Sequence, residues 1–188
     1  MVMRLWKKAW KMSTREKKTF TVFALLYTFL TFTTSFMLQV IISETTETTE
    51  WWQSSFFYPL IVIIIAALAL TLLYAWLTVR RNRKIWATLK CIGWRSGEIS
   101  TLILGYIFYT TIMGLIITVE FCLHWVAILG YIKFTFPDID VNADPLVSLQ
   151  AVVLTVAIFI VVQFVGYIAA RGKITKVRPM LALRRVGE

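Results

Sequence analysis

Charged side chains are scarce in this sequence: they make up 16% of its 188 residues, while 59% are hydrophobic. Soluble globular chains carry about 25% charged residues, so an ordinary soluble domain is excluded, because one small core could not cover this much apolar surface. Two cysteines are too few for a disulfide scaffold, and a single histidine excludes a His-rich metal site. The sequence also lacks the phosphate-binding motif G-x-x-x-x-G-K-[ST], so the chain is not expected to hydrolyse ATP by itself.

Long apolar runs fill most of the chain. At about 1.5 Å per residue, the first run gives roughly 35 Å of helix, enough to cross about 30 Å of hydrocarbon with some tilt. The sequence therefore predicts an all-α integral membrane protein with four spans, at residues 20–42, 56–79, 99–121 and 146–170. Apolar residues continue to Ile132 after the third span, and we interpret this excess as an extension that faces lipid or a partner.

Basic residues collect in three segments beside the spans: seven in residues 1–18, six in 80–98 and six in 171–185. The two other connections, 43–55 and 122–145, are acidic. Because cytoplasmic loops are enriched in Lys and Arg, this asymmetry predicts that both termini are cytoplasmic, in a plasma or inner membrane, with 171–188 as a cytoplasmic tail. Lipid head groups explain the basic segments, so nucleic acid is excluded as a partner.

Residues 1–18 have the pattern of an interfacial helix. Val2, Leu5, Trp6 and Ala9 share one helical face, and the basic residues lie mostly on the other. This pattern is typical of a helix lying on a lipid surface. Its role is either that of an elbow that sets the angle of the first span or that of a basic anchor that fixes orientation.

The cytoplasmic segment 80–98 is the most strongly patterned part of the chain. Its start is basic, Gly93 and Gly97 predict a sharp turn before the third span, and the apolar residues recurring at helical spacing are Ile85, Trp86, Leu89 and Ile92. A solvated loop would not need these apolar residues. We expect them to pack on lipid, on the other cytoplasmic segments or on a partner protein.

The string R-N-R-K-I-W-A-T-L-K-C-I-G-W-R-S in this segment resembles the R-x-x-E-I-x-x-L-[KR]-A-L-G-A-S motif of FtsX-like, MacB-type permease subunits of ABC transporters. The positions that match the motif are Arg81, Ile85, Leu89, Lys90 and Gly93. Lys84 stands where that family commonly has a carboxylate, and Trp94 replaces its small residue. The C-terminal string also resembles the closing P-x-x-A-L-R of the family, at Pro179, Ala182, Leu183 and Arg184.

The resemblance implies one permease domain over residues 1–188, without catalytic residues, metal or cofactor of its own. It would work with a second permease copy or a paralogue and with a cytoplasmic ABC-type ATPase dimer that binds ATP and Mg²⁺. The residues implied in coupling to that ATPase are Ile85, Leu89, Lys90, Gly93, Trp94 and Arg95. The family's large external domain, between the first two spans, is missing here, so its role is either absent or supplied by an extracytoplasmic protein.

Two other classes of function remain. A four-span scaffold or accessory protein would need no ATPase, whereas a small channel is disfavoured because the spans lack a repeated polar stripe.

Glu120 and His124, four residues apart near the outer end of the third span, indicate either a proton or substrate role or a position among the lipid head groups. The acidic residues between Asp138 and Asp144 resemble the start of a Ca²⁺ loop, but the string lacks the required glycine and closing glutamate, which favours a solvated loop.

Overall fold

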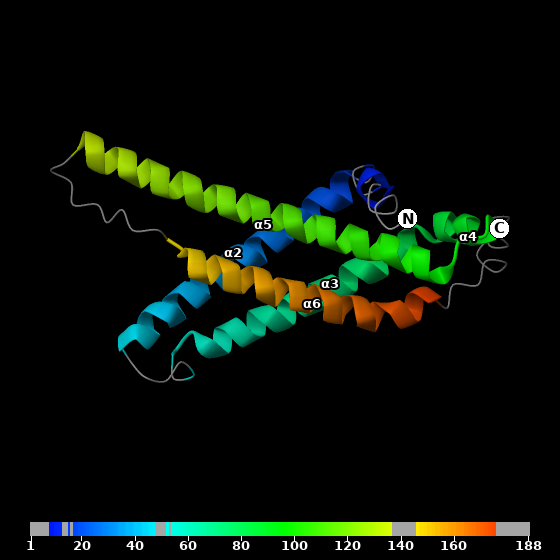
Figure 1. Cartoon of the computed structure of the whole chain (residues 1–188), viewed down its shortest axis with the longest axis horizontal. Coiled ribbons are helices and arrows are strands. Elements are labelled where there is room, and N and C mark those ends of the chain that lie inside the picture. Colours follow the sequence, from blue (N-terminus) through cyan, green and yellow to red (C-terminus); the bar gives the residue numbers. More distant parts are fainter. Residues whose placement is uncertain are drawn as a thin grey trace. The chain divides into compact units, whose positions relative to one another are not determined.

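The computed structural model describes residues 8–12, 15, 17–47, 52, 54–136 and 146–175, with the backbone alone for 45–47 and 169–175. This part of the chain is helical and contains no strand, as the all-α prediction expected. Residues 8–12 form a short helical segment. The longer helices are α2 (Lys17–Glu47), α3 (Phe57–Arg81), α4 (Arg83–Cys91), α5 (Ser96–Thr135) and α6 (Leu149–Thr175) (Figure 1).

The helices α2, α3, α5 and α6 are each long and apolar enough to cross a membrane. This confirms the four predicted spans and indicates a multi-pass membrane protein. The bounds differ most in the third span, which was expected to end at residue 121 before a loop over 122–145. The helix instead continues unbroken to Thr135. Residues 122–135 contain no proline, and Pro137 lies just beyond the observed end, where the residue before a proline is disfavoured in a helix.

The start of α6 is fixed by a polar cap. Ser148 Oγ accepts a hydrogen bond from the backbone amide of Ala151 at 3.3 Å, and the backbone amide of Ser148 donates to Gln39 Oε1 at 2.9 Å. A serine at this position satisfies one of the amide groups that a first helical turn leaves without a partner. The helix therefore begins at Leu149, whereas the apolar pattern alone predicted a start at residue 146.

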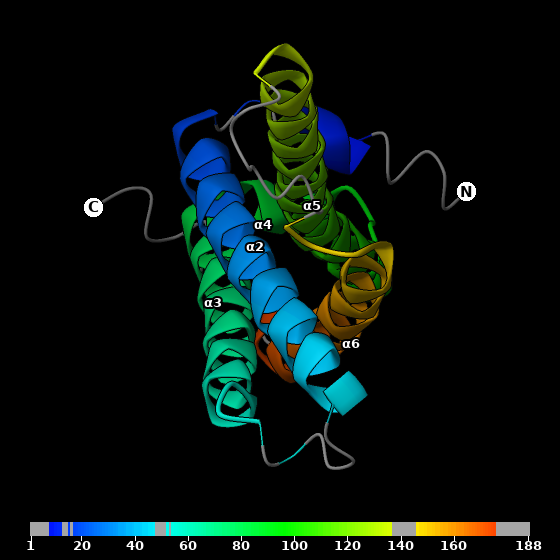
Figure 2. The ribbon, with the colours of Figure 1, turned by 90° about the vertical axis from the view of Figure 1, so that its left-hand side faces the viewer.

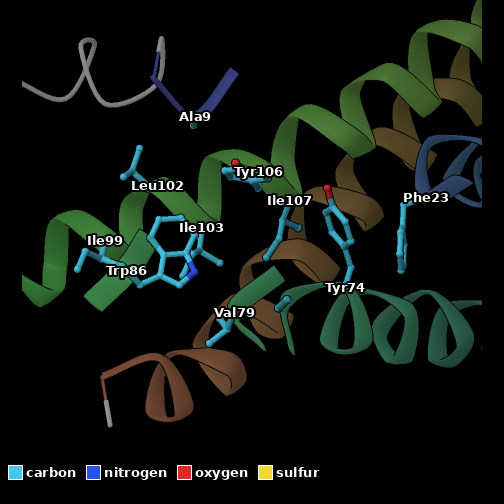
Figure 3. Close-up of a cluster of buried hydrophobic side chains, with 11 residues drawn as sticks. Ala9, Phe23, Tyr74, Val79, Trp86, Ile99, Leu102, Ile103, Tyr106 and Ile107 are labelled. Carbon is cyan, nitrogen blue, oxygen red and sulfur yellow. The ribbon is translucent and has the colours of Figure 1, made fainter. Parts of the chain in front are cut away.

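The chain forms two compact units. The first comprises Met1–Phe23, Ala67–Thr110 and Val161–Glu188, and the second comprises Ala24–Ala66 and Thr111–Ile160. The apolar core of the first unit combines the start of α2 with α3, α4, α5 and the segment 8–12 (Figure 3). Its buried residues are Ala9, Phe23, Tyr74, Ala75, Val79, Trp86, Ile99, Leu102, Ile103, Tyr106 and Ile107.

The second unit has a smaller apolar core of Leu38, Ile41, Leu60, Val147 and Ala151. It also contains interhelical hydrogen bonds between hydroxyl groups. The hydroxyl oxygens of Thr31 and Thr118 lie 2.7 Å apart, and Ser35 donates to Thr155 at 2.9 Å. Hydroxyl pairs of this kind join helices where water is absent, because an unpaired polar group in hydrocarbon is costly.

Several predicted features lie outside the described residues. They are most of the segment 1–18, the acidic string 138–144, and the C-terminal residues Pro179, Ala182, Leu183 and Arg184.

Candidate functional site

The candidate site is α4 together with the turn that joins it to α5. The chain leaves α3 through Asn82, whose backbone amide donates to the carbonyl of Thr78 at 3.2 Å and whose carbonyl accepts from the amide of Trp86 at 3.0 Å. The side chain of Asn82 is buried. One residue thus links the last turn of α3 to the first turn of α4, so α4 is held directly at the end of a membrane-length helix.

The inner face of α4 is fixed to the first unit's core. Trp86 and Ala87 are fully buried, and the Trp86 indole lies beside Ile99 and Ile103 of α5 (Figure 3). Its ring also makes an edge-on contact with Tyr106, with 6.4 Å between ring centroids. Burial of an aromatic side chain of this size is a large stabilising contribution, so α4 and the start of α5 are expected to move together.

A Schellman turn ends α4. The amide of Trp94 donates to the carbonyl of Leu89 at 3.0 Å, and the amide of Gly93 donates to the carbonyl of Lys90 at 3.1 Å. Gly93 has a φ of +95°, a conformation that side chains disfavour. Leu89 and Trp94, which are linked by this motif, both pack against the first unit's core. The predicted helix followed by a sharp turn is therefore present.

The start of α5 is capped by an acidic side chain. Glu98 Oε2 accepts a hydrogen bond from the backbone amide of Arg95 at 2.9 Å. Glu98 is the third residue of α5, and its carboxylate bonds to the backbone amide of Arg95, the residue just before the helix. This is one of the two hydrogen bonds of a capping box. Its negative charge also lies at the positive end of the α5 dipole, which adds to the stability of this corner.

The outer face of α4 is exposed. We use this name for the residues spaced along the side opposite Trp86: Lys84, Ile85, Thr88, Cys91 and Ile92. Ile85 is 43% exposed and Ile92 is 70% exposed, although both are branched apolar side chains. The neighbouring basic residues Arg83 and Arg95 are exposed as well. The outer face therefore offers apolar contacts within a positively charged border.

The residues implied by the family resemblance divide into two groups. Ile85, Gly93 and Arg95 are exposed, whereas Leu89 and Trp94 pack inward and Lys90 is half-buried. Leu89 and Trp94 therefore build the corner and have little surface to offer a partner. Ile92, the most exposed apolar residue here, belonged to the helical pattern but was not among the predicted coupling residues.

The segment 8–12 packs onto the same region. Lys8 Nζ lies 4.7 Å from the centre of the Trp94 ring, and the rings of Trp10 and Tyr109 meet edge-on at 5.0 Å. The side chain of Ala9 is fully buried. A cation over an indole face is an attractive contact, so this N-terminal segment supports the corner between α4 and α5.

Glu120 and His124 share one face of α5, as predicted. His124 Nδ1 lies 2.8 Å from the carbonyl oxygen of Glu120 and 3.7 Å from its carboxylate oxygen Oε2. Both side chains are largely exposed. Elsewhere among the described residues, no group of three or more His, Cys, Asp or Glu side chains is placed to hold a metal ion.

Comparisons of this chain with family models, with curated proteins and with solved structures find no match.

Proposed function

We propose that this chain is the membrane-spanning subunit of an ABC-type transporter complex, and that the outer face of α4 docks a separate cytoplasmic ATPase dimer. The observation that carries the proposal is the division of α4 into two faces. Trp86 packs one face of α4 against α5, while Ile85 and Ile92 lie exposed on the other face. A short helix built in this way between two membrane-length helices can receive a displacement and pass it on to α5.

The proposed roles follow from that arrangement. The partner ATPase binds ATP and Mg²⁺, and this chain converts their turnover into movement of its spans. Both termini and α4 lie in the cytoplasm, and the membrane is the plasma or inner membrane. A second permease copy or a paralogue completes the complex. The movement either exports a lipophilic substrate or activates an extracytoplasmic protein, and the segment 1–18 acts as an interfacial elbow.

The first test is purification of the tagged full-length chain from its native host in mild detergent. Recovery of an ABC-type ATPase in stoichiometric amount, with ATP hydrolysis, is the expected result. Recovery of the chain alone and stable across several detergents would contradict the proposal and favour a four-span scaffold without an ATPase.

The second test locates the contact. Ile92→Asp places a charge in the outer face of α4 and is expected to lower the recovered ATPase at least about tenfold, because a desolvated unpaired charge opposes docking. The matched control is Phe134→Asp on α5, where the replaced side chain is 88% exposed. Equal ATPase recovery with the two variants would show that the outer face is not the docking surface.

A further inference from the structure

Glu120 and His124 present exposed polar groups on the surface of α5, where the two side chains form an i,i+4 pair. Their side chains are 62% and 75% exposed, respectively. The short contact of His124 Nδ1 is with the carbonyl oxygen of Glu120, at 2.8 Å. A carbonyl oxygen only accepts, so Nδ1 carries the proton, which leaves Nε2 for another partner. The carboxylate lies 3.7 Å from Nδ1, beyond hydrogen-bond distance.

The depth of this pair follows from contacts within the second unit. Thr31 is the midpoint of the apolar run from Phe20 to Ile42, and its hydroxyl lies 2.7 Å from that of Thr118 on α5. The Phe32 and Phe121 rings, 5.4 Å apart, confirm the alignment. Thr118 is therefore close to the middle of the bilayer. At about 1.5 Å per residue, Glu120 lies roughly 3 Å and His124 roughly 9 Å further along the helix.

Both residues consequently lie inside the hydrocarbon, whose half-thickness is about 15 Å. The head-group position that the sequence left open for them does not agree with this depth. A carboxyl group facing lipid near the membrane centre is costly, and its short side chain cannot reach the interface. Such groups in membrane proteins normally face protein or a water-filled cavity.

The surrounding helix is uncovered within this chain. In an 18-residue apolar stretch of α5, 11% of the residues are buried. The corresponding stretches of the other three long helices are 28% to 33% buried. No residue from Val119 to Phe136 is buried. Figures 1 and 2 show α5 as one unbroken ribbon through this region. Apart from Glu120, His124, Lys133 and Thr135, the side chains there are apolar, which is typical of a helix covered by lipid or by another protein.

We propose that the face of α5 centred on Glu120 and His124 pairs, inside the bilayer, with the same face of a second copy of the chain. The carboxyl group of each Glu120 meets Nε2 of His124 of the partner subunit. One proton is shared between these two groups, either as a neutral carboxylic acid bonded to imidazole or as a carboxylate bonded to imidazolium. Both polar groups are thereby satisfied without water.

A second copy fits this face better than lipid or an unrelated helix. Lipid offers neither a donor nor an acceptor, and an unrelated helix must bring both at the matching spacing. A second copy has the same membrane orientation, so the two α5 helices run parallel around a two-fold axis. In such a contact residue i meets residue j while j meets i, so one Glu and one His four residues apart complement each other twice.

Disulfide crosslinking of the full-length chain in native membranes tests the pairing. In a Cys91→Ser, Cys122→Ser background, single cysteines are introduced by Ile116→Cys and Ala127→Cys, at exposed positions on either side of the pair. The matched controls are Ile65→Cys on α3 and Val161→Cys on α6, each replacing a side chain that is 61% exposed. Oxidation is expected to join two copies several times faster at the α5 positions than at the control positions.

A charge exchange tests the role of the pair itself. Glu120→Leu and His124→Leu are each expected to weaken the dimer in lipid nanodiscs by about tenfold, as two interhelical hydrogen bonds are lost. The double variant with Glu120→His and His124→Glu exchanges donor and acceptor and is expected to restore dimerisation to within about threefold. Each leucine variant also leaves the facing polar group of the dimer without a partner, so the expected loss includes the cost of burying that group unpaired.

Three outcomes would overturn the inference: equal crosslinking at the α5 and control positions, a crosslinked product that contains a different protein, or leucine variants that dimerise like the unaltered chain. The pairing requires a membrane but no ATPase. The crosslinking test and the ATPase recovery test of the proposed function can therefore succeed or fail separately.

Discussion

The hydroxyl groups of Thr31 and Thr118 join the middle of α2 to the middle of α5, 2.7 Å apart and fully within the second unit's interior. Thr118 also lies 3.0 Å from the carbonyl oxygen of Gly114 in its own helix and 3.3 Å from that of Thr28 in α2. The two helices are thus linked by a small hydrogen-bond network whose two threonines are both buried. This network fixes the register of α5 against α2.

A double-mutant cycle measures that link. Thr31→Val and Thr118→Val keep the shape of each side chain and remove the hydroxyl, so the coupling free energy between them is expected to be about 0.6 kcal/mol and at most about 2 kcal/mol. The measurement is unfolding of the purified chain in mild detergent. Thr33→Val is the matched control, because the Thr33 hydroxyl donates to the carbonyl of Phe29 within its own helix, at 2.8 Å. Additive effects of Thr31→Val and Thr118→Val would contradict the link.

The close approach of α2 and α5 depends on a missing side chain. A Cβ atom at Gly114 would lie 2.9 Å from Tyr27 Cβ and 3.0 Å from the backbone nitrogen of Thr28. Backbone atoms cannot give way cheaply, so Gly114→Ala is expected to destabilise the chain by about 1–3 kcal/mol. Gly97→Ala on the same helix is the control, since nothing lies within 4 Å of its Cβ position. Equal unfolding midpoints for the two variants would contradict this packing.

Trp86 combines a large packing contribution with an unfavourable polar group. Its Nε1 atom is buried and has no hydrogen-bond partner among the described residues. Trp86→Phe keeps an aromatic ring and removes this donor, so the stability is expected to stay within about 1 kcal/mol of the unaltered chain. Trp86→Ala is expected to cost about 3–5 kcal/mol, because it leaves a cavity between α4 and α5. Thermal unfolding in detergent distinguishes these variants, and a similar loss for both would contradict the assignment.

The helices themselves were predictable from composition, but their contacts were not. Apolar runs longer than the hydrocarbon thickness predict four spans, and Gly93 after an apolar helical pattern predicts the end of α4. The same pattern could not separate Ile92 from Leu89, because both are apolar and only tertiary packing decides which one is buried. The choice of coupling residues from the sequence therefore mixed exposed side chains with inward-facing ones.

The length of α5 shows a second limit. The apolar residues after residue 121 were visible in the sequence, but a span of ordinary length placed the helix end there and left Glu120 near the outer end of the span, with its depth open. The contact between Thr31 and Thr118 sets the register of α5 against α2, and the depth that we infer for Glu120 follows from that register. Such a register depends on contacts between residues far apart in the chain, which a hydropathy pattern does not contain.

Gly93 provides the last prediction, because it tests the corner that the proposed ATPase contact requires. Its φ of +95° is strained for any residue with a side chain, and no neighbouring atom lies within 4 Å of the Cβ position. Gly93→Ala is therefore expected to cost about 1 kcal/mol through backbone strain alone, whereas Gly93→Asn is expected to cost less, since asparagine tolerates this conformation better. Unfolding midpoints in mild detergent measure the difference. If alanine is tolerated as well as asparagine, the turn does not require the left-handed conformation. If the corner positions the outer face of α4, the Gly93→Asn chain is expected to recover more ATPase than the Gly93→Ala chain. A stable Gly93→Ala chain that recovers the ATPase fully would show that docking does not depend on this turn.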